Sequence, residues 1–122
     1  MPVIRIEIPE GVSVATKRRI RKGAKQAVLD TLAPKETKYD YVAVREVFGE
    51  IGDGVPLVTV DLRPGREAER KKALVDALAT LLNEELNVEP QDVYVLYREN
   101  PAENHYCGGE PLAPWEPASE LG

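Results

Sequence analysis

The 122-residue sequence is poor in the residues that often reveal chemistry by themselves. It has one cysteine, Cys107, and one histidine, His105, so it can form no disulfide within the chain and lacks the ligand spacing of a metal site. It has no glycine-rich phosphate motif, no apolar signal stretch and no apolar run that approaches a membrane span. Its net charge of −5 supplies no positive field for nucleic acid or membrane. We therefore expect no cofactor, metal, nucleic acid or membrane partner, and a cytoplasmic location.

The sequence does contain an internal repeat. Residues 2–11 align without a gap with residues 56–65, and residues 42–46 resemble residues 95–99. In the first pair of segments the alternate apolar positions coincide: Ile4, Ile6 and Ile8 fall on Val58, Val60 and Leu62. This self-similarity indicates one supersecondary unit used twice.

Each copy has the pattern of a strand, a helix and a second strand. Apolar residues alternate with period two where the strands are expected, and they recur at helical spacing between them. Pro34 and Pro90 follow the two helices, where proline commonly marks an end. The predicted elements, in chain order, are the strand 3–8, the helix 14–31, the strand 40–47, the strand 57–62, the helix 67–86 and the strand 93–98.

These elements predict the fold class α/β (α+β), with two tandem β-α-β repeats. A β-α-β unit of this length forms a parallel strand pair with a right-handed crossover. Two units then give a four-stranded sheet with both helices on one face. The predicted organisation is one domain over residues 1–110, with repeat one at 2–50, repeat two at 55–100 and an active-site loop at 101–110, followed by a proline-rich tail at 111–122. Trp115 is costly to leave in water, so we expect this tail to dock on a protein surface, such as that of a neighbouring subunit.

Pro2 is the sharpest chemical signal. Removal of Met1 would make it a secondary amine at the start of a strand, whereas an ordinary α-amino group titrates at about 7.7–8.0. Burial and nearby cations both lower the pKa of an amine, so this one could be neutral at pH 7 and act as a general base or as a nucleophile. The competing interpretation is a proline that merely begins an edge strand. Pro56 has the same position in the second repeat but is internal and has no amine.

Arg63 and Arg66 are the second signal. They lie in the turn Arg63-Pro-Gly-Arg66, between a predicted strand and a predicted helix. Two guanidinium groups there could hold a carboxylate, assisted by amides at the helix start. The alternative is a pair of solvated turn arginines. The first repeat has Pro9 and Val12 at the matching positions, so a site that needs both the amine and the arginines would be built once per chain.

Residues 99–109 form a glycine-ended loop that is the third signal. Tyr106 could wall an apolar pocket and keep the pKa of the amine low. His105 and Cys107 are two residues apart, but short spacing alone does not create a catalytic cysteine–histidine pair. The basic runs at 17–22 and 70–72 lie on the predicted helices, and we interpret them as solvated helix faces.

Pro2 with its alternating strand, Ile8-Pro-Glu-Gly-Val-Ser13, and His105-Tyr-Cys-Gly-Gly-Glu110 resemble 4-oxalocrotonate tautomerase. Over residues 2–110 the chain resembles two fused copies of that subunit, a form similar to cis-3-chloroacrylic acid dehalogenase and malonate semialdehyde decarboxylase. The spacing of Arg63-Pro-Gly-Arg66 matches the arginine pair of the dehalogenase. Membership of this tautomerase superfamily implies a small carboxylate substrate, a homotrimer and no cofactor. It implies that Pro2 is the catalytic base or acid, that Arg63 and Arg66 bind the carboxylate, and that Tyr106 is a pocket wall.

Three departures from these relatives bear on the reaction. Val12 stands where the short tautomerase has an arginine. Cys107 lies near the position of the carboxylate with which the dehalogenase activates water, and Glu103 is the nearest acid. Glu36 or Asp40 would have to replace the aspartate of the decarboxylase.

The sequence therefore predicts an isomerase in which Pro2 is the general base for keto–enol tautomerisation of a small 2-oxo or dicarboxylic acid. Two alternatives stay open. The same site could run decarboxylation, or hydration or dehalogenation, of a three-carbon acid. If Met1 is retained, the Pro2 nitrogen is an amide without basicity, and the chain is a non-catalytic oligomeric scaffold.

Overall fold

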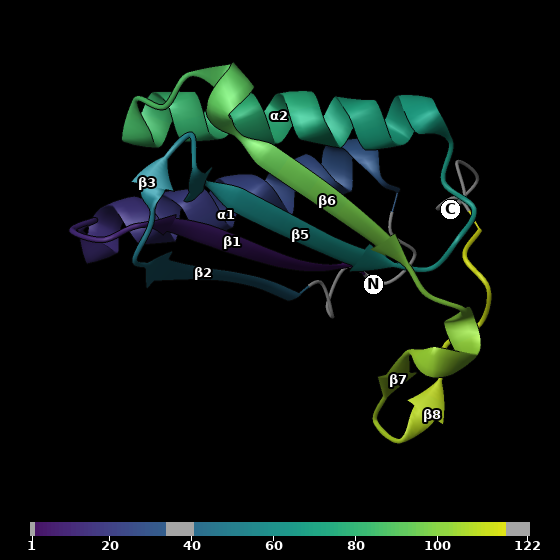
Figure 1. Cartoon of the computed structure of the whole chain (residues 1–122). Coiled ribbons are helices and arrows are strands. Elements are labelled where there is room, and N and C mark those ends of the chain that lie inside the picture. Colours follow the sequence, from purple (N-terminus) through teal and green to yellow (C-terminus); the bar gives the residue numbers. More distant parts are fainter. Residues whose placement is uncertain (1, 34–40, 117–122) are drawn as a thin grey trace.

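The computed structural model describes residues 2–33 and 41–116. Its main sheet has four strands in the order β2-β1-β5-β6 (Figure 1). The parallel pairs are β1 (Val3–Pro9) with β2 (Tyr41–Val47), and β5 (Leu57–Leu62) with β6 (Tyr94–Glu99). Antiparallel pairing of β1 with β5 joins the two repeats. The helices α1 (Val14–Thr31) and α2 (Ala68–Leu86) pack on one face of this sheet, so the predicted fold is confirmed.

The six predicted elements agree with the observed bounds to within one residue. The structure adds short elements that the repeat pattern did not reveal: β3 (Glu50–Ile51), β4 (Gly54–Val55), η1 (Pro90–Asp92), η2 (Ala102–Asn104), β7 (Tyr106–Cys107) and β8 (Glu110–Pro111). The last of these corrects the predicted start of the tail. Pro111 pairs with Tyr106 across a two-glycine turn and therefore belongs to a hairpin.

Local signals explain where the helices begin and end. The Ser13 side chain caps α1 by accepting a hydrogen bond from the Thr16 amide at 3.1 Å, which satisfies one of the free amides of the first turn. Asn87 ends α2 in the left-handed conformation, with φ of 56°, a role in which asparagine is second to glycine. Where the helices meet, a Cβ on Gly23 would lie 2.6 Å from Leu81 Cδ1, so glycine lets α1 and α2 approach closely.

The core lies between the helices and the inner face of the sheet. The fully buried apolar residues there come from both repeats in matched positions: Ile4, Ile6, Ile8, Ile20, Ala24, Val28, Val58, Val60, Leu62, Leu74, Leu78 and Leu82. Each large aliphatic side chain among them contributes about 1.5–3 kcal/mol by leaving water. This shared core fixes the strand ends on which the site is built.

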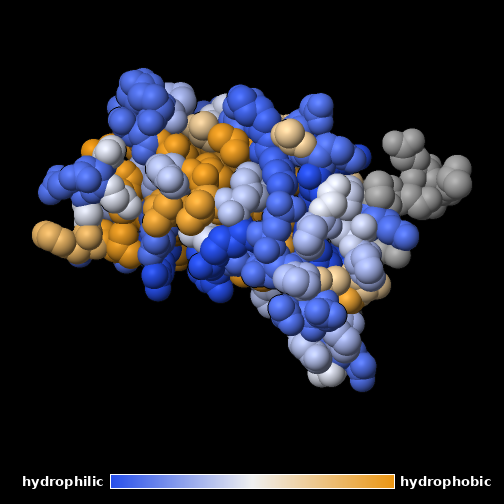
Figure 2. Space-filling model, turned by 45° about the vertical axis from the view of Figure 1, so that its right-hand side comes forward, coloured by the Kyte–Doolittle hydropathy of each residue, from blue (hydrophilic) through white to orange (hydrophobic). Residues whose placement is uncertain are grey.

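The outer face of the sheet carries charges beside exposed apolar groups. Asp61 Oδ2 accepts hydrogen bonds from Arg5 at 2.9 Å and from Arg98 at 2.8 Å. The Arg98 hydrogen bond is the main reason that the pKa of Asp61 lies below its ordinary value. Tyr94 and Leu96 on β6 are 65% and 44% exposed. Figure 2 shows apolar and strongly hydrophilic side chains next to one another on the molecular surface, which is the mixed character expected of a face that meets either solvent or a partner.

No helix in the described part of the chain is long and apolar enough to cross a membrane.

Candidate active site

Pro2 is buried at the start of β1. Its carbonyl accepts a hydrogen bond from the Tyr41 amide at 3.3 Å, which ties it to β2. On the other side, Val3 lies opposite Asp61 in the antiparallel pair. Continuing that register by one residue places Pro2 opposite Leu62, the last residue of β5. The main chain of Pro2 is thus held on the β2 side by a hydrogen bond and lies in line with the end of β5 on the other.

The two arginines come directly after the end of β5 in the chain. Arg63 is the residue after Leu62, and the turn it begins leads into α2 through Glu67. Because β1 and β5 run in opposite directions, the first residue of one and the last residue of the other lie at the same end of the sheet. The fold therefore brings Pro2 and the Arg63–Arg66 turn to one end, as the asymmetry of the repeats predicts. The roles of these residues in catalysis stay predictions.

Both arginine side chains are buried, Arg63 at 2% and Arg66 at 4% exposure, which excludes a pair of solvated turn residues. Arg63 Nη1 donates to the carbonyl of Ala113 at 2.6 Å. Arg66 Nε donates to the carbonyl of Leu32, at the end of α1, at 3.0 Å. Buried guanidinium groups are rare unless they are paired. Here they connect repeat two with the end of the first helix and with the C-terminal segment.

Trp115 completes this cluster from the C-terminal side. Its ring lies 4.5 Å from the Arg66 guanidinium carbon and 5.8 Å from that of Arg70. The indole Nε1 donates to the carbonyl of Ala33 at 3.1 Å. Gly65 has φ of +126°, and a Cβ there would lie 3.1 Å from Trp115 Cε3, so glycine is needed both for the turn and for the close approach. The expected docking of Trp115 thus takes place on its own chain.

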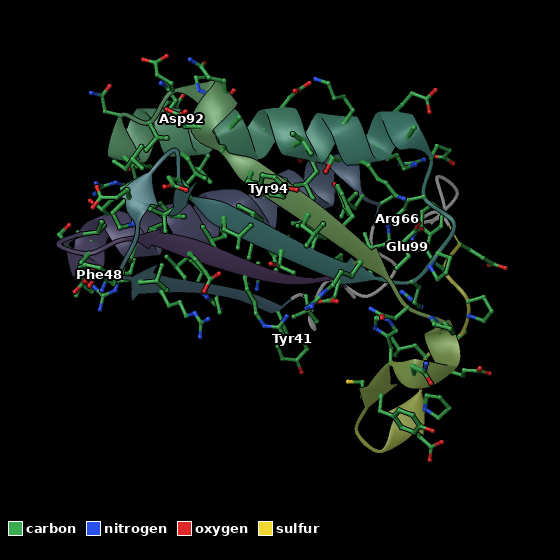
Figure 3. The ribbon with its side chains drawn as sticks, in the orientation of Figure 1. Tyr41, Phe48, Arg66, Asp92, Tyr94 and Glu99 are labelled. Atoms are coloured by element: carbon green, nitrogen blue, oxygen red, sulfur yellow. The ribbon has the colours of Figure 1, made fainter. Side chains whose placement is uncertain are left out.

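Tyr106 is not brought together with these residues. It is 67% exposed on the β7–β8 hairpin, which projects away from the sheet (Figure 1). Figure 3 labels Glu99 at the end of β6 and Phe48 at the opposite end of the sheet. Within one chain Tyr106 cannot wall the site at Pro2, because its ring faces solvent.

The other residues singled out in the sequence are dispersed. Glu103 lines a shallow pocket of about 340 Å³ between η2 and the C-terminal segment. Cys107 is half-buried in β7. The Val12 amide donates to Glu46 Oε1 at 2.9 Å. Glu36 and Asp40 lie outside the described residues.

His105 is within the electrostatic influence of Arg63, a relation that the sequence analysis did not predict. Burial is the main cause that lowers the pKa of His105 below 6.5, and the positive charge of Arg63 adds to it. A main-chain hydrogen bond at Asn100 and the charge of Asp61 act in the opposite direction. The available signal was that this loop, which directly follows β6, holds the single histidine of the chain.

The depressed pKa of His105 predicts a pH dependence of stability. The unfolded chain takes up a proton near pH 6.5, whereas the folded chain does so at lower pH, so protonation favours the unfolded state between these values. We expect the free energy of unfolding to fall as pH drops from 7.5 to 5.5. Urea unfolding at both pH values checks this, with His105→Gln as control. The prediction is wrong if the free energy of unfolding of His105→Gln falls between pH 7.5 and 5.5 by as much as that of the wild type.

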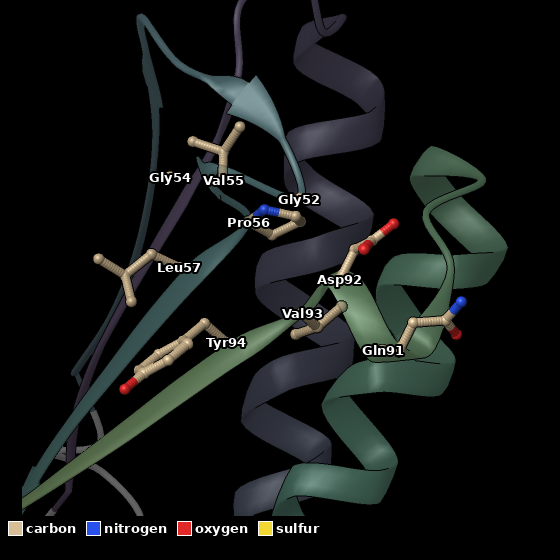
Figure 4. A pocket seen from close by; sticks show the side chains of 9 residues that line it. All are labelled: Gly52, Gly54, Val55, Pro56, Leu57, Gln91, Asp92, Val93 and Tyr94. Atoms are coloured by element: carbon tan, nitrogen blue, oxygen red, sulfur yellow. The ribbon is translucent and has the colours of Figure 1, made fainter.

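A second pocket, of about 210 Å³, lies around Pro56, the repeat counterpart of Pro2 (Figure 4). It is lined by Asp92, Tyr94 and neighbouring residues of the β4–β5 junction. The Pro56 nitrogen is an internal amide and cannot act as a base.

Comparison with known proteins gives the class. Residues 56–114 match the family described as "Tautomerase enzyme". A solved structure of native fused 4-OT has a TM-score of 0.77 at 22% identity, covering 89% of this chain and 94% of that one. Malonate semialdehyde decarboxylase gives 0.68 at 22% identity, with coverage of 87% and 90%. A macrophage migration inhibitory factor-like protein from Entamoeba histolytica gives 0.78 at 16% identity, with coverage of 91% and 98%. No curated protein sequence matches the chain.

Residues 56–114 are therefore similar in sequence to the tautomerase family, and the whole chain has the fold seen in fused 4-OT, with two β-α-β repeats. The resemblance drawn from the sequence is confirmed at this level.

Proposed function

We propose that this chain is an isomerase that moves a proton between carbon and oxygen in a small 2-oxo or dicarboxylic acid. The observation that supports the proposal is the antiparallel register of β1 and β5, which, extended by one residue, brings Pro2 to the end of the sheet where the Arg63–Arg66 turn begins. A buried amine and two buried guanidinium groups are the minimum for this chemistry.

In the proposed reaction the neutral Pro2 nitrogen takes a proton from the carbon next to the substrate carbonyl. The electron pair of that C–H bond becomes a carbon–carbon double bond, and the carbonyl oxygen takes the negative charge. Arg63 and Arg66 bind the carboxylate and stabilise the enolate, and such electrostatic stabilisation is usually the largest catalytic term. Returning the proton from Pro2 to another carbon, or to the oxygen, completes the tautomerisation.

The C-terminal segment bears on how a substrate reaches the arginines. The Ala113 carbonyl oxygen accepts a hydrogen bond from Arg63 Nη1 at 2.6 Å. A carboxylate oxygen of the substrate is suited to the same position. A substrate carboxylate makes a charge-assisted and often bidentate contact with arginine, stronger than that of a neutral carbonyl. We therefore propose that substrate displaces residues 113–115 from the arginine pair.

Replacement of Trp115 by alanine tests this displacement. The substitution removes the ring from Arg66 and the hydrogen bond to Ala33, so the segment competes less well for Arg63. We expect KM to fall several-fold, up to about tenfold, since the lost contacts are each worth about 1 kcal/mol. Trp115→Phe, which keeps a ring over Arg66, should lie between wild type and Trp115→Ala. A KM that rises in Trp115→Ala contradicts the displacement.

The proposal requires that Met1 is absent from the mature protein. Proline is small, and methionine before a small residue is a substrate for removal. Intact mass spectrometry of natively expressed protein should give the mass of the chain without one methionine. A mass that includes Met1 makes the Pro2 nitrogen an amide and removes the base.

We further propose that the chain works as a cytoplasmic homotrimer. A solved fused 4-OT structure with a TM-score of 0.79 is described as an asymmetric trimer, and the outer sheet face with Tyr94 and Leu96 offers apolar surface for contact between copies. In such an assembly, the exposed Tyr106 of one subunit would line the active site of a neighbouring subunit. Sedimentation equilibrium at micromolar concentration tests the state.

A further inference from the structure

The pocket of about 210 Å³ at Pro56 takes no part in the proposed reaction (Figure 4). Pro56 precedes β5 and Arg63 follows it, so the pocket and the arginine turn lie at opposite ends of the same strand. The repeat makes this end the counterpart of the space at Pro2. The matching positions near the end of β1, however, hold Pro9 and Val12 in place of the two arginines. The two proline ends therefore share a scaffold and differ in the charges that they offer a ligand.

The charge that this pocket offers is negative. Of the nine described residues that line it, Asp92 is the single acidic one and none is basic. Main-chain donors are also scarce there, since Pro56 has no amide hydrogen. Four lining residues already donate their amides to main-chain carbonyls: Gly52, Asp92, Val93 and Tyr94. An anion would meet a carboxylate and few donors, whereas a cation would meet a charged acceptor.

The Asp92 carboxylate is set against the turn between β3 and β4. Gly52, in that turn, has φ of +83°, and a Cβ on it would lie 3.1 Å from Asp92 Oδ1. Glycine is therefore needed both for the turn conformation and for the close approach of the carboxylate. Within residues 2–33 and 41–116, no hydrogen bond or ion pair engages the Asp92 side chain. Its oxygens are thus available to a ligand in the pocket.

The rest of the lining is mainly apolar. Pro56, Leu57 and Val93 contribute aliphatic groups, and Tyr94 contributes a ring that is 65% exposed. An aromatic ring attracts a cation that lies over its face. The volume of about 210 Å³ is below the roughly 300–1,000 Å³ of pockets for drug-sized ligands, so the ligand must be small.

We propose that the Pro56 pocket binds a small primary ammonium ion with an apolar body. The ammonium group donates to the Asp92 carboxylate, and the apolar part packs against Pro56, Val93 and the Tyr94 ring. This site does not rest on the proposed function. It takes a cation where the Pro2 end is proposed to take a carboxylate, and it needs no free amine at Pro2.

Protein labelled with ¹⁵N in glycine reports on both ends of the sheet in one NMR spectrum. Gly52 and Gly54 line the pocket, whereas Gly65 lies in the arginine turn. The full chain is titrated with benzylammonium, benzyl alcohol and benzoate, which share a ring and differ in charge. We expect benzylammonium to shift the Gly52 and Gly54 signals saturably, with a Kd on the order of millimolar for so few atoms. It should bind about three- to tenfold more tightly than benzyl alcohol, the range for a partly exposed charged contact, and benzoate should bind no more tightly than the alcohol.

Two variants show whether Asp92 is the cause. Asp92→Asn keeps the size of the side chain and removes its charge, so benzylammonium and benzyl alcohol should bind equally. Asp53→Asn is the matched control, because it makes the same change one residue after Gly52 at an exposed position outside the pocket lining, and it should keep the preference. Unchanged signals of the glycines outside the pocket establish that both variants are folded. The wild-type comparison of the three ligands stands without either variant.

Four results would each overturn the proposal. Equal binding of benzylammonium and benzyl alcohol to the wild type removes the role of charge. A preference that survives in Asp92→Asn, or that Asp53→Asn abolishes as well, assigns it to the net negative charge of the chain. Shifts confined to Gly65 place the amine at the other end of the sheet. The absence of any shift at Gly52 and Gly54, as when a neighbouring subunit covers the pocket, leaves no site for a ligand.

Discussion

Replacement of Pro2 by alanine should lower kcat by about 10²- to 10⁴-fold, the usual contribution of a positioned general base. Alanine also permits removal of Met1, but it leaves a primary amine on a main chain without the ring that fixes φ. The fold should survive, because Pro2 directly precedes β1 and its hydrogen bond to Tyr41 uses its carbonyl, which alanine retains.

The measurement is steady-state ketonisation or enolisation of small 2-oxo acids, followed by ultraviolet absorbance. Pro9→Ala is the matched control, since it makes the same substitution at the other end of β1, and its kcat should stay within a factor of about two. Turnover by Pro2→Ala at the wild-type rate would remove Pro2 from the mechanism.

Replacement of Arg63 by glutamine should lower kcat/KM by about 10²- to 10³-fold, the range observed when one oxyanion-stabilising donor is lost. Arg63 is expected to act twice, on the substrate carboxylate and on the Pro2 amine. A cation near an amine disfavours its protonated form and lowers its pKa, so loss of Arg63 raises it. The variant should therefore lose more activity at pH 6 than at pH 8.5.

That pH-dependent loss separates a catalytic role from a structural one. Arg63 is 2% exposed, so we expect the variant to be less stable, but instability alone does not move the acidic limb of the pH–rate profile to higher pH. Arg5→Gln is the control, because this arginine lies on the outer sheet face with its side chain 52% exposed. An unchanged pH–rate profile for Arg63→Gln would place Arg63 away from the Pro2 amine.

The fold could be predicted in nearly full detail because the repeat carried the information twice. Matched apolar positions such as Ile6 and Val60 are both buried in the core, and the period-two and helical spacings fixed each main element. The antiparallel pairing of β1 with β5 that joins the repeats did not follow from the pattern, which predicts four strands in one sheet but not their order.

Only those candidate site residues whose side-chain or main-chain chemistry is recognisable from the residue type alone could be predicted from the sequence. Pro2 and the Arg63–Arg66 turn were identified because the repeats differ there. The contacts of Trp115 depend on how the segment after β8 folds back to the end of α1, where Trp115 meets Ala33, 82 residues away in sequence. No periodicity describes such a segment. The two-glycine turn after Cys107 makes a projecting hairpin of the expected pocket loop, and the role of Tyr106 as a pocket wall stays a prediction.

The central claim is a free, neutral secondary amine at Pro2 beside the arginine turn. Protein labelled with ¹⁵N in proline, prepared without Met1, gives the titration of that nitrogen directly by NMR. The account predicts a single amine signal with a pKa below the ordinary 7.7–8.0 of an α-amino group, which moves upward in Arg63→Gln. An amine that titrates at the ordinary value and does not respond to Arg63→Gln would contradict it.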